Sequence, residues 1–287
     1  MFTNSLKTLF KTSLLTSACC LSACSSMEPG NSAQAQPTYE RLNAVLWMQT
    51  SAEYYALTQS AYTQATSMVD KALADKHWSA AQEQSGDYSK LPPAIILDID
   101  ETVLDNLPFQ AQLIKDNAPF TQEAWDKWTK LAAAEPLPGA KAFLDYASTK
   151  GITIFYVTNR DASQEEDTRA NLRQQNLPLR DDIDVVLTRN ENRWSSSDKG
   201  ARRHYVSQDF RIIALVGDDF GDFVSGAKGT AETRVELAKN SAAAWGSKWF
   251  LIPNPVYGSW EAALFNHDYT TPVNEVTGLK LKQLKGF

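Results

Sequence analysis

Short apolar runs alternate along the chain with longer segments in which apolar residues recur at helical spacing. The first clear run, residues 94–97, has no polar alternation, which is typical of a strand buried on both faces of a parallel sheet. Four later runs have the same character and are expected to form further strands: 152–157, 185–187, 212–216 and 249–252. Strands that alternate with helices predict an α/β fold with a doubly wound parallel sheet.

Helical periodicity fills most of the sequence between these runs. Residues 41–74 carry apolar side chains at helical spacing and contain no Pro or Gly. Residues 120–134 predict another helix, with Thr121 as its N-cap. Three more helices are expected at 140–149, 162–175 and 198–206, and Ser197 is the candidate cap of the last one.

The N-terminal region has the pattern of an export signal rather than of a folded element. Residues 1–23 combine a basic start with an apolar core too short to span a membrane, which predicts a signal peptide. The string Leu21-Ser22-Ala23-Cys24 resembles the bacterial lipobox, which implies cleavage before Cys24 and lipidation of that residue. Residues 24–38, rich in Ser, Gly, Pro and Gln, are expected to form a flexible tether. The alternative is a simple secretory signal that leaves Cys24 free.

Cysteine content and charge indicate where the mature chain is located and what it does not bind. Two of the three cysteines lie within the expected signal, so no disulfide framework is predicted. Ser25 after the lipidated residue favours the outer membrane, so we expect a lipid-anchored protein of the bacterial cell envelope. A net charge of -6 gives no indication of binding to a nucleic-acid polymer. Residues 39–287 suffice for one large domain with a small cap, and a homo-oligomer is left open.

Polar residues collect where the predicted strands end. Because the carboxyl ends of parallel strands share one edge of the sheet, these residues are expected to meet in one site. They are Asp98 and Asp100 after the first strand, Thr158 and Asn159 after the second, Asp218 and Asp222 after the fourth, and Lys199 on the helix before the fourth strand. The plain alternative for the first pair is a polar loop in which an Asp caps the next helix.

These residues resemble the motifs of the haloacid dehalogenase (HAD) superfamily. Asp98-Ile99-Asp100-Glu101-Thr102 matches its Asp-x-Asp-x-Thr motif, Thr158 its hydroxyl motif, Lys199 its lysine motif and residues 217–222 its final acidic motif. Lys228 is a competitor for the lysine position. The longer strings at 97–106, 155–160 and 254–261 look like one branch, the class C acid phosphatases, which are bacterial lipoproteins with acid phosphatase and 5'-nucleotidase activity.

The resemblance covers about residues 47–260 and implies a fold. That fold is a HAD-like, Rossmann-type phosphatase domain over residues 39–287 with a smaller helical cap. The cap segments are expected near residues 40–85 and 105–135.

The residue types suit the hydrolysis of a phosphate ester, which needs an in-line nucleophile and positive charge around the phosphoryl oxygens. Asp98 is the candidate nucleophile, passing through an aspartyl-phosphate, and Asp100 the candidate general acid and base. The resemblance implies Mg²⁺ as cofactor, held by Asp98, the Asp100 carbonyl, Asp218 and Asp222. It also implies that Thr158, Asn159 and Lys199 bind the phosphate.

Two aromatic residues are candidates for recognition of the rest of the substrate. Trp125 lies in the expected cap and Tyr257 follows the last predicted strand, so a nucleotide base could stack between them. The expected substrate is then a small phosphomonoester such as a 5'-nucleoside monophosphate. The alternative is that Trp125 packs against Trp128 inside the cap.

Two other functions remain open at this stage. One is a ligand-binding lipoprotein with little turnover, and the other is a phosphatase for non-nucleotide phosphomonoesters. Binding of a phosphate and a metal would not require the carboxylate of Asp100, so that residue favours an enzyme. The three histidines match neither a zinc motif nor an Arg-His-Gly phosphatase motif.

Overall fold

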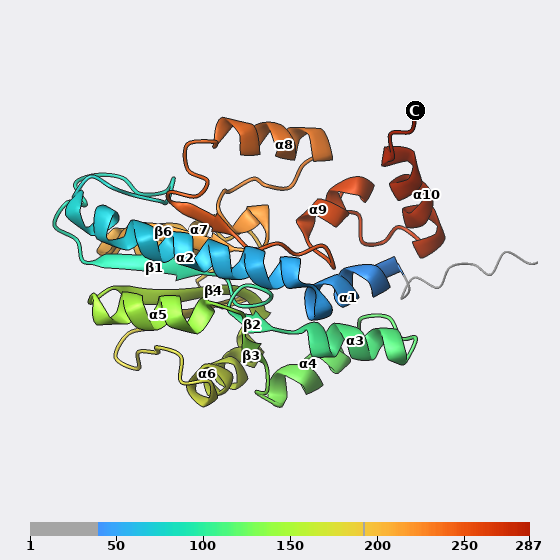
Figure 1. Ribbon diagram of the computed structural model, residues 1–287, viewed down its shortest axis with the longest axis horizontal. Helices are drawn as coiled ribbons and strands as arrows, with labels where there is room; N and C mark the ends of the chain where they lie inside the picture. Colours follow the sequence, from blue (N-terminus) through green and yellow to red (C-terminus); the bar gives the residue numbers. More distant parts are fainter. Residues whose placement is uncertain (1–39, 192) are drawn as a thin grey trace, which may run out of the picture. The chain divides into compact units, whose positions relative to one another are not determined.

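A five-stranded parallel sheet forms the centre of the domain. The computed structural model describes residues 40–191 and 193–287 (Figure 1), so the expected signal peptide, Cys24 and the tether lie outside the described residues. The strands lie in the order β5-β4-β1-β6-β7, and every neighbouring pair is parallel. Their bounds are β1 Pro93–Leu97, β4 Thr153–Asp161, β5 Val186–Arg189, β6 Arg211–Gly217 and β7 Trp249–Leu251. The predicted fold class is confirmed.

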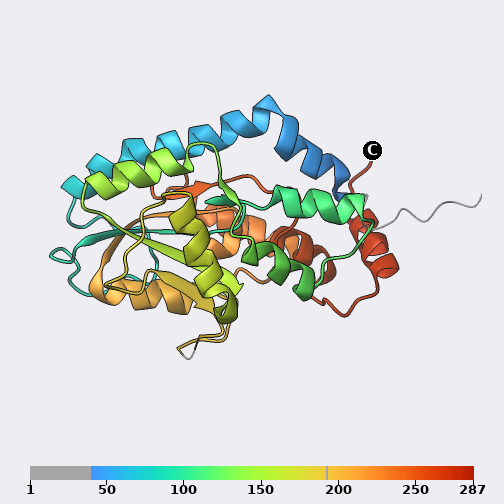
Figure 2. The same ribbon diagram turned by 90° about the horizontal axis from the view of Figure 1, so that it is seen from below.

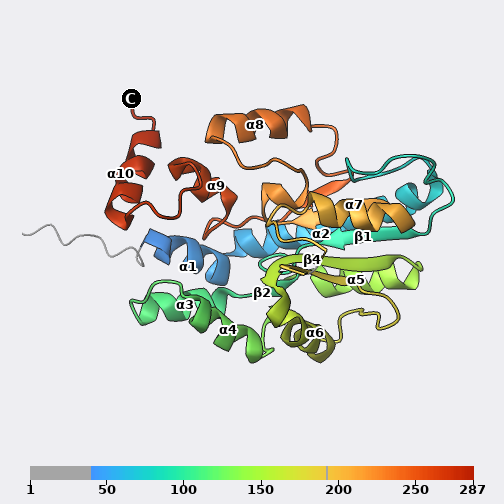
Figure 3. The ribbon, with the colours of Figure 1, turned by 180° about the vertical axis from the view of Figure 1, so that it is seen from behind.

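Helices cover both faces of the sheet. The longer ones are α1 Leu42–Thr50, α2 Ala52–Ala74, α3 Leu107–Lys115, α4 Gln122–Lys130, α5 Ala140–Thr149, α6 Glu165–Gln174, α7 Gly200–Asp209, α8 Ala231–Asn240 and α10 Val273–Gln283. Helices α2 and α5 lie on one face, and α6 and α7 lie on the other (Figures 2 and 3). Among the described helices, none is long and apolar enough to cross a membrane.

Strand β1 is the middle strand, which explains its unbroken apolar sequence. Its register joins it to β4 on one side and to β6 on the other, and Ala94, Ile95 and Leu97 have no exposed surface. With both faces covered by helices, a polar residue inside this strand would lose its hydration without a partner. The first polar side chain therefore comes directly after the strand, at Asp98.

The helix predicted over residues 41–74 is two helices. Ser51 adopts an extended backbone conformation between α1 and α2, and its hydroxyl accepts the N–H of Tyr54 at 3.0 Å. Serine is a strong N-cap because its side chain satisfies a free N–H of the first turn, so the chain restarts there. Helix α2 continues along the sheet, whereas α1 turns away and packs against α3 (Figure 2).

An insertion between β1 and α5 carries the predicted second cap segment. The short antiparallel strands β2 (Leu104–Asp105) and β3 (Glu135–Pro136) close its base, and α3 and α4 lie between them. Thr121 caps α4 as predicted, because its hydroxyl accepts the N–H of Ala124 at 3.2 Å. Ser197 does not cap α7: Lys199 occupies the N-cap position, and Asp198 accepts the N–H of Gly200 at 2.7 Å.

Candidate active site

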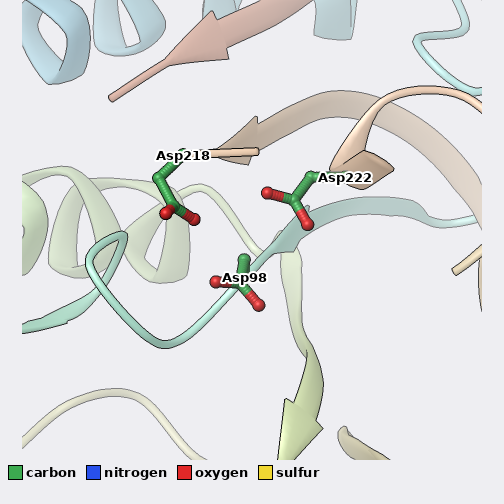
Figure 4. A group of neighbouring side chains, drawn as sticks. All are labelled: Asp98, Asp218 and Asp222. Atoms are coloured by element: carbon green, nitrogen blue, oxygen red, sulfur yellow. The ribbon is translucent and has the colours of Figure 1, made fainter. Parts of the chain in front are cut away.

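Three carboxylates meet at the carboxyl ends of β1 and β6. Asp98 follows β1 and donates its N–H to the carbonyl of Val216 on β6 at 3.0 Å. Asp218 follows β6, and Asp222 ends the 3-10 turn η3 Phe220–Asp222. One oxygen of each carboxylate lies within 4.8 Å of the others, and Figure 4 shows the three side chains as neighbours. The spatial cluster expected from sequence order is thus present.

Lys199 lies against this cluster. Its ammonium group forms ion pairs with Asp98 and with Asp222, the latter at 2.6 Å, and its side chain is 6% exposed. Lys199 is the N-cap residue of α7. Lys228, the competitor, is exposed and lies on the wall of the same cavity. The geometry therefore assigns the contact with the acids to Lys199.

Burial changes the acidity of the cluster. It raises the pKa of Asp98 to about 7, although the neighbouring Lys199 opposes that rise. It also raises the pKa of Asp218 and Asp222, each of which faces another carboxylate. For Lys199, burial would lower the pKa, but attraction by Asp222 and Asp98 outweighs it and the pKa lies above its ordinary value. Three carboxylates lie around one ammonium group, that of Lys199, so a further cation would be attracted to the site.

Supporting residues hold Asp218 and Asp222 in place. Asp218 accepts hydrogen bonds from Asn254 at 2.8 Å and from the Thr102 hydroxyl at 3.3 Å. Asp222 accepts the N–H of Asp219 at 2.9 Å. A Cβ at Gly217 would lie 2.2 Å from an oxygen of Asp222, so the close approach of Asp222 requires glycine there.

Asp100 lies outside the three-carboxylate cluster. Its carboxylate pairs with Arg160, Nη2 to Oδ1 at 2.8 Å, and also accepts a hydrogen bond from Asn106 at 2.9 Å. Sequence reasoning assigned no role to Arg160 or Asn106, although both fall inside the strings that resemble the phosphatase family. The signal that could have found them is their residue type, because an Arg or Asn inside the domain needs a polar partner such as a carboxylate.

The two predicted phosphate ligands on β4 differ in exposure. Thr158 is completely buried, and its hydroxyl accepts the N–H of Arg160 at 3.0 Å. Asn159 is exposed, lies on the wall of the cavity and accepts a hydrogen bond from Arg202 Nη2 at 2.7 Å. Arg202 itself is fully buried behind the site, and burial lowers its pKa to about 10. Their contact with a phosphate stays a prediction.

A cavity of about 710 Å³ opens above the acid cluster. Asp98, Asp100, Lys199, Asp218 and Asp222 line it, and we call these five residues its floor. We call the other lining residues its wall, and they include both predicted aromatic residues. Trp125 packs edge-on against Phe109, with ring centroids 5.2 Å apart, so it also belongs to an aromatic cluster of the insertion between β1 and α5. Three further wall residues come from a C-terminal region for which the pattern predicted no element: Phe265, His267 and Tyr269.

Comparison with known proteins identifies the family. The model of the HAD superfamily, subfamily IIIB (acid phosphatase), matches residues 5–260. The chain belongs to this family. The resemblance seen in its motifs is therefore confirmed.

Solved structures of a class C acid phosphatase agree with the assignment. The enzyme from Bacillus anthracis is 34% identical, and the match covers 88% of this chain and 99% of that chain with a TM-score of 0.78. A second structure of the Bacillus anthracis enzyme, with tungstate bound, gives 33% identity, the same coverage and a TM-score of 0.78. The α/β fold of this chain thus matches that of the class C acid phosphatase.

Curated relatives are more distant. The stem 28 kDa glycoprotein of Glycine max is 24% identical over 168 residues, which cover 56% of this chain and 58% of the relative. Acid phosphatase 1 of Solanum lycopersicum is 26% identical over 165 residues, or 56% of this chain and 57% of the relative. The chain thus spans somewhat more than half the length of these relatives.

Proposed function

We propose that this HAD acid phosphatase hydrolyses phosphomonoesters, with Mg²⁺ as cofactor, through an aspartyl-phosphate on Asp98. The observation that carries the proposal is the position of Asp98. It lies at the tip of the central strand, on the floor of a cavity, next to Lys199 and two further carboxylates. A nucleophile at this point meets a substrate phosphate that enters from the cavity.

Asp98 and Asp100 have different roles in the proposed reaction. Asp98 attacks the phosphorus atom, the bond to the leaving oxygen breaks, and that oxygen takes a proton from Asp100. Asp100, now a carboxylate, removes a proton from the water that attacks the aspartyl-phosphate, which releases phosphate and restores Asp98. Lys199 would hold phosphoryl oxygens by its charge. Thr158 and Asn159 are the other proposed phosphate ligands.

The residues fit a divalent cation. HAD phosphatases generally use one, and Asp98, Asp218 and Asp222 present three oxygens within 4.8 Å of one another. Carboxylate oxygens suit Mg²⁺, and among the described residues the cluster pairs with one ammonium group only, that of Lys199. We propose Asp98, Asp218, Asp222 and the Asp100 carbonyl as its ligands. When bound, Mg²⁺ would offset the negative charge of the acids and of the phosphate.

We propose a nucleoside 5'-monophosphate as the substrate. Trp125 and Tyr257 lie on the wall of the cavity whose floor carries Asp98, and the cavity volume of about 710 Å³ admits more than a phosphate group. Stacking on aromatic rings favours a base without selecting among bases. The tungstate in the Bacillus anthracis structure, a tetrahedral oxyanion like phosphate, supports an anion site in that relative.

A phosphate-release screen tests the function. Purified protein is assayed with nucleoside 5'-monophosphates, nicotinamide mononucleotide, a sugar phosphate and an aryl phosphate, each with and without Mg²⁺. Asp98→Asn, prepared identically, controls for contaminating phosphatases. We expect Mg²⁺-dependent release that is fastest for the nucleotides. Fastest release from a sugar or aryl phosphate would favour a non-nucleotide phosphatase, and tight binding without release would favour a ligand-binding lipoprotein.

We also propose that the mature protein is anchored by lipid at Cys24 to the bacterial cell envelope, on the outer membrane. The lipobox string and the tether composition support this. Mass spectrometry of the mature N-terminus tests it, and Cys24→Ala should remove the lipid mass while the enzyme keeps its turnover. An unmodified Cys24, or cleavage elsewhere, would end the proposal.

A further inference from the structure

Arg160 is the buried partner of Asp100. Its side chain is 1% exposed and lies at the end of β4, next to the strand that carries Asp98. Nε and Nη2 donate to Oδ1 of Asp100 at 3.0 and 2.8 Å, while Nη1 donates to the hydroxyl of Thr168 on α6 at 3.1 Å. The guanidinium group is thus fixed from two sides. A planar fork held in this way fixes the position of the carboxylate it binds.

The two oxygens of Asp100 are held very differently. Oδ1 accepts three donors, the two from Arg160 and Nδ2 of Asn106 at 2.9 Å. Oδ2 has one long contact, 3.3 Å from Nε of Arg160. An oxygen that already accepts three hydrogen bonds has no place for a proton of its own. The proton that Asp100 transfers must therefore be carried by Oδ2.

Asn106 completes the hold on Asp100, and its orientation is also fixed. It is completely buried, its Oδ1 accepts Nε1–H of Trp128 at 2.7 Å, and its backbone N–H donates to Glu101 at 3.0 Å. With Oδ1 engaged as an acceptor, Nδ2 is the group that faces Asp100. Trp128 belongs to α4 of the cap, so the hold on Asp100 extends from the sheet into the cap.

We infer that Arg160 is a positioning residue, which binds Oδ1 of Asp100 and leaves Oδ2 free to give its proton to the leaving oxygen. This inference rests on the proposed function. As the bond from phosphorus to the leaving oxygen breaks, the proton on Oδ2 moves to that oxygen and Asp100 becomes a carboxylate beside the guanidinium group. In the second half-reaction Oδ2 takes the proton back from the attacking water. Arg160 itself exchanges no proton.

Leaving groups of different acidity test this assignment. p-Nitrophenyl phosphate and p-nitrobenzyl phosphate differ by one methylene, but the first releases a stable phenolate and the second an alkoxide that needs a proton. Arg160→Gln should lower kcat for the benzyl ester on the order of 100-fold, the scale of general acid catalysis, and that for the phenyl ester only a few-fold. KM should change little for both esters. Asp100→Asn should show the same preference, and the double variant should lose little more than Asp100→Asn alone.

Control variants separate positioning from folding. Arg160→Lys keeps the charge without the fork, so it should recover part of the benzyl ester rate and carries the test if Arg160→Gln fails to fold. Arg169→Gln removes a partly buried Arg of α6 that pairs with Glu165 on the same helix and with Asp184, which precedes β5. This control should lower kcat for the two esters equally or not at all. Circular dichroism and thermal unfolding establish that each variant is folded.

The outcomes distinguish this inference from the proposed function. Equal losses on the two esters in a folded Arg160 variant, or no loss, would overturn the positioning role while the phosphatase stands. Absence of Mg²⁺-dependent turnover of either ester by the wild-type protein would overturn the proposed function and this inference with it.

Discussion

The floor and the wall of the cavity are built in different ways. The floor is charged: Asp98 and Asp218 directly follow strands of the sheet, Asp100 lies two residues after Asp98, Asp222 ends a 3-10 turn, and Lys199 is the N-cap residue of α7. Lys199 pairs with Asp98 and Asp222, and these three residues are buried. The aromatic residues that line the cavity all belong to its wall, and they come from short helices and loops. Some of their rings are largely exposed, with Phe120 at 51% and Tyr269 at 78%. The groups that we propose to react are therefore fixed by the sheet, whereas the groups that we propose to select a substrate lie on short helices and loops around it.

Electrostatics separates the two regions further. On the floor, burial raises the pKa of all three clustered acids, and a neighbouring carboxylate adds to the rise for each of them, so the charged cluster is unfavourable unless a cation enters. On the wall, contacts between rings, such as that of Phe120 with Trp125 at a centroid distance of 6.4 Å, involve no charged group. Changes on the floor should therefore affect every substrate, and changes on the wall only some.

The largest effect should follow from Asp98→Asn. An amide cannot attack phosphorus, so kcat should fall on the order of 10⁴-fold or more for every substrate, as loss of a nucleophile does elsewhere. Steady-state kinetics and circular dichroism of the purified variant measure this. Near-normal turnover in a folded Asp98→Asn protein would rule out the aspartyl-phosphate.

Removal of divalent cations should have an effect almost as large. Chelator-treated protein should lose turnover of nucleotides and alkyl phosphates alike, because the floor would again carry three acids against one Lys. Added Mg²⁺ should restore activity and raise the melting temperature through binding to the folded state. Full activity in protein shown to be metal-free by elemental analysis would contradict the proposed cofactor.

Changes on the wall should be smaller and selective. Trp125→Ala and Tyr257→Ala should each lower kcat/KM for a nucleoside monophosphate by about 5- to 150-fold, which corresponds to about 1–3 kcal/mol of stacking. A small alkyl phosphate should be almost unaffected. Tyr55→Ala, a change on the exposed side of α2, is the matched control. Equal losses of kcat/KM on both substrates would show that the rings support the structure and do not bind the base.

The sequence allowed the sheet to be predicted because each of its five strands contains a short apolar run that is largely buried. The run of residues 94–97 and the acid after it needed only the length of the run and the order of polar residues. The break at Ser51 was missed because the apolar spacing continues across it, and a single capping hydroxyl decides the outcome. The C-terminal region was missed because it is largely exposed, and α10 contains no buried residue.

The floor could be predicted for the same reason, since strand order brings Asp98 and Asp218 together once the sheet is parallel. The arrangement around Asp100 could not be predicted, because it depends on side-chain rotamers and on contacts between β4 and the insertion that contains α4. The spacing of apolar residues in the sequence does not indicate whether the side chain of Arg160 points into the domain. Tyr257 and Trp125 could be placed near one edge of the sheet, but only the structure shows that both line one cavity.

Two helix caps provide the finest test of the comparison between floor and wall. Ser51→Ala and Thr121→Ala each remove a side chain that accepts one N–H of the first turn, at 3.0 and 3.2 Å, so each should cost its helix about 1 kcal/mol. Helix α2 packs on α5 and the sheet, so Ser51→Ala should lower the global free energy of unfolding by that amount. Helix α4 is nine residues long and mostly exposed, so Thr121→Ala should instead speed amide hydrogen exchange within α4 by about fivefold and raise KM for nucleotides. If Thr121→Ala lowers global stability as much as Ser51→Ala and leaves exchange in α4 unchanged, the wall unfolds together with the floor and is not an independent element.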